Sequence, residues 1–514
     1  MKTYKLFQAL LSVFMMLWGN QACMKLDPEV YDKVSMFWQT DDQIAAGVAP
    51  AYSGLRDYVS NSTYNLNECS TDEVIVPIRG ADWADNGIWE KMWKHSWQSD
   101  HPFMAETWQF INTNIARVNL ILETVNNLNP QPPDLHSIQA ELKTVRAYNN
   151  YIALDLYGNV PIVNDNNATG CSQLGNKSRA EVFTYVEKEI KDNLTGLSTE
   201  VNPKTYGRVT QWFAQALLAK LYLNAQVYTG KSRWNDCIAA CDAILISNKY
   251  TLEENFFANF LIANEKSREN IFVIPFDFDA GLNYFYIQGE TLHNSSYATF
   301  GLESGGWNGF CSTAEYLSIF DIKDIRRKMF LVGQQYINQI IDSAHIQYDT
   351  DVNLPLIFDP VITKFSNPGP ESRMLGARCA KWEFNKSSGG SMSNDFAIYR
   401  LADIILMKAE AQFRNGDIPG ALITINQKIN NVSIRSRAGL PDFGTSEMTA
   451  DGLLAERARE LSWEGHRRND MIRLGHFTDA RIPEKAVSEN FRTLYPIPKA
   501  ELDKNPCLVQ NPGY

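Results

Sequence analysis

The chain has 514 residues with 48 basic and 59 acidic side chains, and hydrophobic residues make up 44% of it. This composition is typical of a large folded protein and excludes a disordered or a fibrous chain. The net charge of −11 argues against a nucleic-acid partner, because no excess of basic side chains attracts phosphates. Aromatic residues reach 12%, a first indication of a ligand with flat apolar faces.

The N-terminus has the pattern of an export signal. Basic residues precede an apolar stretch over 6–18, which is too short to span a bilayer. Ala22-Cys23 then resembles a bacterial lipoprotein processing site, although Asn20 stands where such sites usually have Leu. We therefore expect a signal peptide at 1–22 and a mature chain at 23–514 that is anchored by a lipid on Cys23. An ordinary secretory signal with cleavage nearby is the alternative.

The first half of the chain carries helical periodicity. Apolar residues recur on one helical face through 145–156, and the pattern ends at Gly158, with Pro161 after it. Further helices are predicted over 180–197, 209–228 and 233–247.

Two segments, 214–240 and 401–422, both read as helix, turn, helix with small residues at the packing face. This pattern is tetratricopeptide-like, and stacked pairs of this kind share one core. Residues 250–400 are instead rich in Gly, Asn, Asp and aromatic residues, with weak periodicity and loops at 301–309 and 387–393. The sequence therefore predicts a mostly α fold, in which a helical-repeat scaffold carries a large irregular, loop-rich half.

No catalytic signature is found. The chain has no Walker A loop, GxGxxG, GxSxG or HExxH motif, and its seven His lack metal-ligand spacing. We therefore predict no catalytic residues, no metal site and no cofactor, with a structural calcium left open. Counting cannot exclude a glycosidase, because any two of the 59 acidic residues could form its carboxylate pair.

Glu456, Glu460 and Glu464 recur at four-residue spacing, which places them on one face of a predicted helix. They form either a general acid/base cluster or an ion-pair network that locks the last helices together. We favour the network, because structural ion pairs are common and no nucleophile or metal motif accompanies the stretch. Glu464 and Arg468 also have the favourable i, i+4 order for a helical ion pair.

The eight cysteines include Cys23, so seven remain after acylation and at least one thiol has no disulfide partner. Cys237 and Cys241 lie one helical turn apart, where Cβ atoms about 5–6 Å apart are too distant for an unstrained disulfide. We expect the remaining cysteines to be small core residues.

Tryptophans give the best lead to a ligand. Trp89, Trp93 and Trp97 share one face of a helix and are predicted to pack in the core. Trp83 and Trp307 differ, because both lie in polar, turn-rich segments that cannot form an amphipathic face. Each is either a loop anchor or an exposed platform.

A third aromatic loop holds Tyr284 and Tyr286. An exposed aromatic ring covers the apolar face of a sugar, while Asp, Asn or Arg side chains bond its hydroxyls. The sequence therefore predicts a glycan-binding surface of Trp83, Trp307 and one or both tyrosines. The polar candidates beside it are Arg79, Asp72 and Asn86.

Seven motifs follow one another along nearly the whole mature chain. They are Leu26-Asp27-Pro28, 70–83 with its Arg-Gly pair, 140–161, 399–411, 456–468, Tyr495-Pro496-Ile497-Pro498 and Gln510-Asn511-Pro512-Gly513-Tyr514. These motifs resemble those of the SusD-like, or RagB, outer-membrane lipoproteins of the Bacteroidetes. The atypical lipoprotein site is the one visible departure.

The resemblance implies one unit of about four tetratricopeptide-like helix pairs with an irregular ligand-binding half, divided into parts at about 23–230 and 260–514. It implies display on the outer cell surface, for which Asp27 and Glu29 resemble the export signal. It also implies glycan capture without catalysis, and a SusC-like TonB-dependent transporter as partner. Trp83 and Trp307 match two ligand-binding Trp of the family.

Two other functions stay open. One is a helical-repeat lipoprotein that binds peptides or another nutrient for the same type of transporter, and the other is a glycosidase. Glycan capture needs Trp83 and Trp307 exposed on one surface, whereas a peptide would occupy the helical groove or a deep cavity. Hydrolysis needs two carboxylates about 5–10 Å apart in a cleft beside these Trp. A flat platform suits a straight glycan, and a curved one suits a helical glucan.

Overall fold

The computed structural model describes residues 37–514, apart from positions 61, 81, 283–284 and 388–389. The signal peptide and the lipid site predicted at Cys23 lie outside these residues, and so does Tyr284. Among the residues that are described, no helix is both long and apolar enough to cross a membrane.

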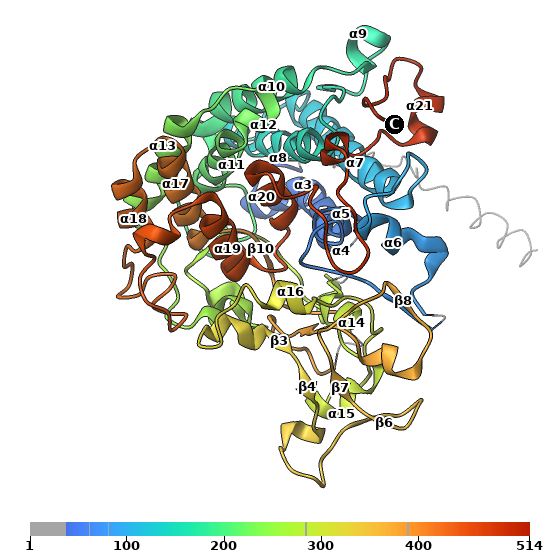
Figure 1. Cartoon of the computed structure of the whole chain (residues 1–514). Coiled ribbons are helices and arrows are strands. Elements are labelled where there is room, and N and C mark those ends of the chain that lie inside the picture. Colours follow the sequence, from blue (N-terminus) through green and yellow to red (C-terminus); the bar gives the residue numbers. More distant parts are fainter. Residues whose placement is uncertain (1–36, 61, 81, 283–284, 388–389) are drawn as a thin grey trace, which may run out of the picture.

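Long helices form one half of the molecule and pack side by side in an arc (Figure 1). Helix pairs within it pack as the tetratricopeptide-like pattern predicts, which confirms the mostly α fold class. The pairs are α7 (Pro102–Asn126) with α8 (Leu135–Leu156), α11 (Gln211–Leu223) with α13 (Trp234–Ser247), α17 (Leu401–Arg414) with α18 (Ile418–Ile425), and α19 (Ala450–Leu461) with α20 (Arg467–Leu474). Helix α10 (Arg179–Asn193) joins α8 to α11, and α3 (Asp41–Ser53) and α5 (Ser62–Glu68) pack on α7.

Local sequence signals explain most helix ends. Helix α8 ends at Leu156 as predicted, and Gly158 follows with a positive φ of 73°. Helix α10 starts with a capping box, in which the Ser178 hydroxyl and the Glu181 carboxylate each accept from a backbone N–H of the other residue. The helix predicted over 209–228 is interrupted at Asn224, after which the short α12 (Ala225–Thr229) continues.

A two-stranded antiparallel sheet lies between the two halves (Figure 1). Strand β2 (Asn270–Ile274) pairs with β10 (Phe396–Arg400), with Phe396 opposite Ile274. All residues of both strands are buried, and β10 runs directly into α17. The strands thus attach the irregular half to the helices at both of its ends.

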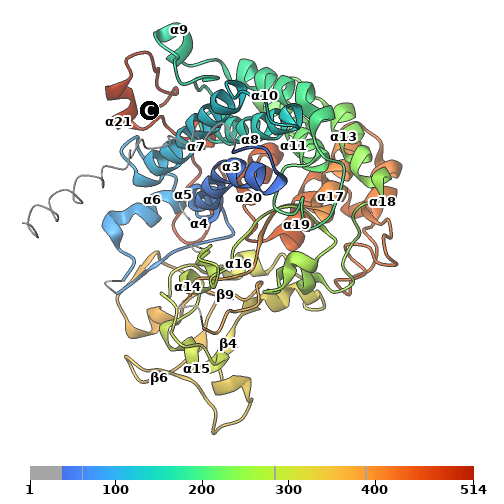
Figure 2. The same ribbon diagram turned by 180° about the vertical axis from the view of Figure 1, so that it is seen from behind.

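The remaining half is irregular, as predicted, and protrudes from the helices in Figures 1 and 2. Strand β1 (Ile78–Arg79) pairs in parallel with β8 (Ser366–Asn367), so the N-terminal aromatic segment joins this half. The other elements are short. They are α6 (Ile88–Trp93), α14 (Ile287–Thr291), α15 (Tyr297–Phe300), α16 (Ala314–Leu317), and the strand pairs β3 (Phe330–Leu331) with β9 (Arg378–Cys379), β4 (Gly333–Gln334) with β7 (Ile357–Phe358), and β5 (Tyr348–Asp349) with β6 (Leu354–Pro355).

The charged stretch near the C-terminus forms the ion-pair network that we favoured. Glu460 is fully buried and accepts from three buried guanidiniums, those of Arg326, Arg400 and Arg437. Burial raises the pKa of the nearby Glu456, but Arg326 and other guanidiniums outweigh it and bring this pKa down to about 2. The network therefore depends on charge pairing inside the core.

The predicted pairing of Glu464 with Arg468 is wrong. Helix α19 ends at Leu461, and the chain turns through positive φ angles at Trp463 and Gly465, so Glu464 lies off the helix. Its carboxylate instead pairs with Lys381 and with Nε of Arg400 at 2.7 Å. The guanidinium of Arg468 lies 2.9 Å from the carboxylate of Asp155.

The aromatic and cysteine predictions hold in part. Trp89, Trp93 and Trp97 are buried as expected, but α6 ends at Trp93, so Trp97 comes from the segment after the helix. Cys237 and Cys241 are buried free thiols, as are the cysteines at 69, 311 and 379. Cys171 and Cys507 are not core residues: they form a disulfide between α9 (Cys171–Leu174) and the C-terminal segment, 336 residues away.

Candidate functional site

The fold brings Trp83 and Trp307 together although 224 residues separate them. The indole Nε1 of Trp83 donates to the carbonyl oxygen of Trp307 at 2.8 Å. Trp307 also packs against Tyr286, with ring centroids 5.4 Å apart. We call these three side chains, Trp83, Tyr286 and Trp307, the aromatic surface.

Trp83 anchors this surface. Its ring is half-buried and packs on Trp89 and Phe310, with centroids 5.6 and 6.3 Å apart. Gly309 permits this contact, because a Cβ atom there would lie 2.4 Å from the Trp83 ring. Trp83 itself has a φ of 61°, a costly conformation for a bulky side chain that persists only where the surroundings fix it.

Trp307 is the exposed member, with 47% of its surface accessible. Its ring rests on Gly289 of α14, where an added Cβ would touch the indole at 3.5 Å. Its backbone N–H donates to the carbonyl of the same glycine at 2.6 Å. Before it, Gly305 runs so close to Asn294 that a Cβ would lie 1.8 Å from a carbonyl oxygen. Contacts with Gly289 and Asn294 therefore fix the backbone of this loop, while the Trp307 side chain stays exposed to solvent.

Arg79 lies beneath the surface, which corrects the prediction that it contacts ligand. It is buried, and all five of its N–H groups have partners. The acceptors are the carbonyl oxygens of Asn308, Ser372 and Leu375 at 2.8 Å, the carbonyl of Gly309 at 3.3 Å and the sulfur of Cys311 at 3.3 Å. Burial lowers the pKa of Arg79. Arg79 therefore positions the Trp307 loop and has no donor left for a ligand.

The carboxylate of Asp72 is also occupied by a contact within the protein. Both of its oxygens accept from Arg467 of α20 at 2.7 Å, which joins the N-terminal segment to the helical half. Asn86, in contrast, is exposed in the turn after Trp83 and has a φ of 53°. Asn86 stays a predicted ligand contact, and Asp72 does not.

A cluster that the sequence did not reveal borders the aromatic surface. Arg373 pairs with Asp82, Asp349 and Asp351, and its carbonyl oxygen accepts from the Asn308 side chain at 2.9 Å. Only Asp82, next to Trp83 in the chain, gave a sequence signal. The other members come from loops nearly 300 residues further on.

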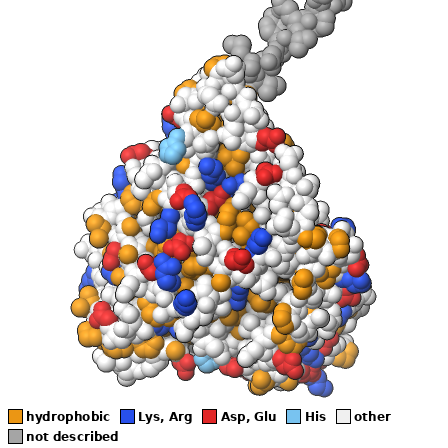
Figure 3. Space-filling view, turned by 90° about the horizontal axis from the view of Figure 1, so that it is seen from above, with side chains coloured by type: hydrophobic (Ala, Val, Ile, Leu, Met, Phe, Trp, Pro, Cys, Tyr) orange, Lys and Arg blue, Asp and Glu red, His pale blue; other side chains and the backbone are white. Residues whose placement is uncertain are grey.

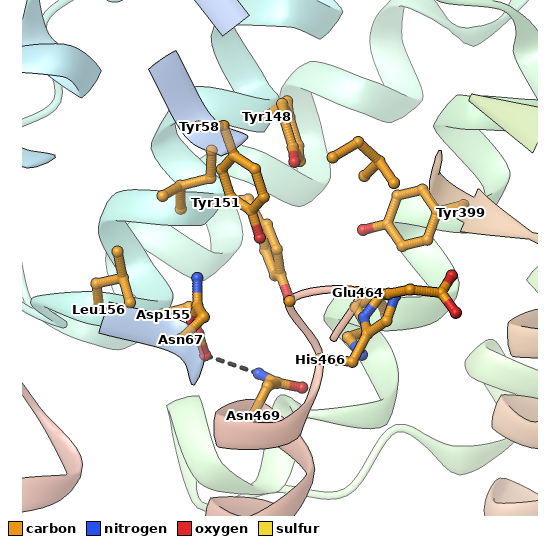
Figure 4. Close-up of a pocket in the computed structure, with 14 residues that line it drawn as sticks. Tyr58, Asn67, Tyr148, Tyr151, Asp155, Leu156, Tyr399, Glu464, His466 and Asn469 are labelled. Carbon is orange, nitrogen blue, oxygen red and sulfur yellow. Dashed lines mark hydrogen bonds between the residues drawn. The ribbon is translucent and has the colours of Figure 1, made fainter. Parts of the chain in front are cut away.

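A small cavity lies in the helical half next to strand β10 and the turn at 464–466 (Figure 4). Its volume is about 40 Å³, enough for a few water molecules. Tyr58, Tyr148 and Tyr151 point into it, and below them Asn469 donates to Asp155 at 2.8 Å. A larger surface groove of about 540 Å³ lies elsewhere, between residues 201–206, 248–250 and 265–270.

The described residues contain no cluster of three or more His, Cys, Asp or Glu side chains suited to a metal ion. Figure 3 shows acidic and basic side chains interspersed over the face that is seen from above. The chemistry on offer is therefore aromatic stacking and hydrogen bonding at the loops.

Fold and loops together define a helical-repeat protein that displays an aromatic surface on irregular insertions. Two family models match the chain: "Starch-binding associating with outer membrane" over residues 35–223, and "SusD family" over residues 363–514. The chain belongs to the SusD-like family.

Similar proteins cover almost the whole chain. The starch-binding protein SusD of Bacteroides thetaiotaomicron is 23% identical over 500 residues, spanning 88% of this chain and 85% of its own. A SusD-like protein of Formosa agariphila is 22% identical and spans 95% of both chains. The solved structure of surface glycan-binding protein A from Bacteroides thetaiotaomicron with laminarihexaose shares the fold, with a TM-score of 0.72, 19% identity, and coverage of 92% of this chain and 100% of that one. A laminarin-binding SusD-like protein superposes with a TM-score of 0.70 at 18% identity, covering 93% and 100% of the two chains.

Proposed function

We propose that this protein captures glycans at the cell surface through its aromatic surface and delivers them to a SusC-like TonB-dependent transporter. The observation that carries the proposal is the exposed indole of Trp307. Its backbone carbonyl accepts from the Trp83 indole, and its ring packs against Tyr286. Aromatic rings fixed in this way stack on the apolar faces of sugar rings at little entropic cost. Relatives named for binding starch and laminarin support this ligand class.

The inclination of the rings favours a curved glycan. The planes of Tyr286 and Trp307 meet at 46°, so a ligand that stacks on both must bend between them. We therefore expect a helical or bent glucan to bind more tightly than a straight β-linked chain.

A peptide ligand is the less favoured function. The cavity in the helical half is far smaller than the roughly 300 Å³ that small-molecule sites occupy. A peptide would instead use a surface groove, either the one of about 540 Å³ or one of about 430 Å³ beside α7.

We also propose that binding proceeds without catalysis. The exposed carboxylates near the aromatic surface are those of Asp82 and Asp351, which pair with Arg373, and that of Asp85, which accepts from the Trp89 indole at 2.8 Å. None of them is a buried carboxyl of the kind that serves as a general acid. Glu290 does have a raised pKa, but its Oε2 atom is buried near Cys69.

For location and partner, the proposal rests on the family. We propose a single unit over 23–514, an outer-membrane position on the cell surface, and a lipid anchor on Cys23. The helical half, whose described residues include no aromatic side chain as exposed as Trp307, is then the face available to the transporter.

The test is calorimetric titration of the purified protein with maltohexaose, laminarihexaose and cellohexaose. Trp307→Ala is the test variant, and Trp212→Ala, a half-buried Trp on α11, is its matched control. By analogy with base stacking, losing one aromatic platform costs about 1–3 kcal/mol, or roughly 5–150-fold in affinity. We expect a bent glucan to bind the wild type and the Trp212→Ala control, and to bind Trp307→Ala at least about fivefold more weakly. Equal binding by Trp307→Ala would refute the site, and no binding by any glycan would direct the search to peptides.

A further inference from the structure

One side of the aromatic surface is bordered by a charged cluster with a fixed position. Its centre, Arg373, contacts both Trp loops. The Arg373 carbonyl accepts from Asn308, the neighbour of Trp307, and its Nη1 lies 3.5 Å from the carboxylate of Asp82, the neighbour of Trp83. The cluster and the aromatic rings are therefore held in register by direct contacts.

The cluster carries more acidic than basic groups. Nε of Arg373 donates to the buried Asp349 at 2.6 Å, and its Nη2 pairs with Asp351. The side chains of Asp82 and Asp351 are 64% and 54% exposed, whereas that of Arg373 is only 15% exposed. The guanidinium is thus enclosed by carboxylates, of which those of Asp82 and Asp351 face solvent.

Other titratable groups adjoin the cluster. His293 lies 3.2 Å from Asp349, but burial lowers its pKa, so it is uncharged at neutral pH. In the turn after Trp83, the exposed Asp85 accepts from the Trp89 indole at 2.8 Å. Two more guanidiniums adjoin the cluster, because Arg378 donates to the Arg373 carbonyl at 3.1 Å and Arg79 to the Ser372 carbonyl at 2.8 Å, but both are buried. The charges of the cluster that face solvent are therefore the carboxylates of Asp82 and Asp351.

We propose that Asp82 and Asp351, held by Arg373, make the aromatic surface selective for uncharged glycans. Carboxylates are acceptors only, so they bond sugar hydroxyls and repel carboxylate or sulfate groups. Arg373 cannot serve an anionic ligand, because its exposed edge already faces two carboxylates. This inference rests on the proposed function and narrows its ligand class.

The test compares laminarihexaose and maltohexaose with hexagalacturonate, a polyanion of similar length, at low and at high salt. The test variant is Asp82→Asn/Asp351→Asn, in which both amides still accept hydrogen bonds but carry no charge. Asp503→Asn removes a similarly exposed, ion-paired carboxylate on the remote α21 (Lys499–Lys504) and is the matched control. Asp82→Asn alone, at the longest contact of the cluster, is the second variant in case the double variant does not fold.

We expect the wild type to bind a neutral hexasaccharide at least about tenfold more tightly than hexagalacturonate at low salt, with a smaller difference at high salt. The double variant should lose most of this difference by gaining affinity for hexagalacturonate, while its affinity for the neutral glycan stays within about threefold. A residue with only a structural role would not move the salt dependence.

Two results overturn the inference alone: a wild type that binds hexagalacturonate as tightly as the neutral glycans, or a difference that the variants leave unchanged. A wild type that binds neither kind of glycan overturns the proposed function and the inference together. The two failures are therefore distinguishable.

Discussion

Buried arginines are used differently in the two halves of this molecule. In the helical half, the carboxylates of α19 are paired with Arg400 and Arg437, and with Arg326, which reaches them from the irregular half. In the irregular half, Arg79 and Arg378 donate mainly to backbone carbonyls, among them those of Leu375 and Gly376. Loops lack the regular hydrogen-bond ladders of helices and sheets, so guanidiniums satisfy their buried carbonyls instead.

The two kinds of partner also shift the pKa values of the buried arginines in opposite directions. The carboxylates around Arg326 and Arg400 outweigh the effect of burial and raise the pKa of these two arginines. Arg378 lacks such a partner, so burial and the nearby Arg79 lower its pKa to about 9. The helical half is thus stabilised by ion pairs between arginines and carboxylates. The irregular half is stabilised by hydrogen bonds from buried guanidiniums to backbone carbonyls, and its outer surface stays free for a ligand.

Removing one carboxylate from the helical network tests this comparison most severely. Glu460→Gln leaves three buried guanidiniums without a shared counter-ion, which should cost about 3–5 kcal/mol in the free energy of unfolding. Denaturant unfolding measures the loss. The control, Glu501→Gln, breaks an exposed pair with Lys504 and should cost less than about 1 kcal/mol. Similar losses in the two variants would show that the network does not hold the helices.

The same two halves differ in how much the sequence could predict. Helices α8, α10 and α13 follow from periodicity and end signals, because these depend on neighbours within one or two turns. Their polar, turn-rich segments drew attention to Trp83 and Trp307, but their direct contact depends on the pairing of Ile75 with Cys311.

What escaped prediction depends on contacts between distant segments. Cys171 and Cys507 are 336 residues apart, and Arg373 meets Asp82 only after the loops have folded. Arg79 and Asp72 have the residue types of ligand contacts, and only their burial and bonding partners show that they serve the fold. Periodicity was also misleading at Glu464, because it does not register the turn at Trp463 and Gly465.

Carboxyl groups offer a second, smaller test. Charge pairing brings the pKa of Glu456 in the helical half to about 2, whereas burial without a charged partner raises the pKa of Glu290 in the irregular half to about 8. A raised pKa in the folded state favours folding at low pH, and this contribution disappears as the pH rises from about 4.5 to about 8. Glu290→Gln should therefore be more stable than the wild type at pH 8 by roughly 1–3 kcal/mol, with little difference at pH 4.5.

Unfolding of both proteins by urea at the two pH values measures this difference. Glu303→Gln, an exposed carboxylate of the same half, is the control and should show no change with pH relative to the wild type. A Glu290→Gln difference that is the same at both pH values would mean that the Glu290 carboxyl is solvated in the folded protein.

The smallest effect concerns the brace behind Trp307. Trp83→Phe keeps a ring against Trp89 and Phe310 but removes the indole N–H that donates to the Trp307 carbonyl. A lost hydrogen bond of this kind is worth about 0.5–1.5 kcal/mol, so glycan affinity should fall roughly two- to tenfold while the unfolding transition shifts little. The matched control is Trp212→Phe, which removes a comparable bond at 3.0 Å to the carbonyl of Thr199, far from the loops. If both variants bind glycan equally well, the Trp83 hydrogen bond does not position Trp307. The position of Trp307 is then set by the packing of its ring on Gly289. If only Trp83→Phe loses affinity, the irregular half depends on single hydrogen bonds to carbonyls for its function, just as it depends on Arg79 and Arg378 for its fold.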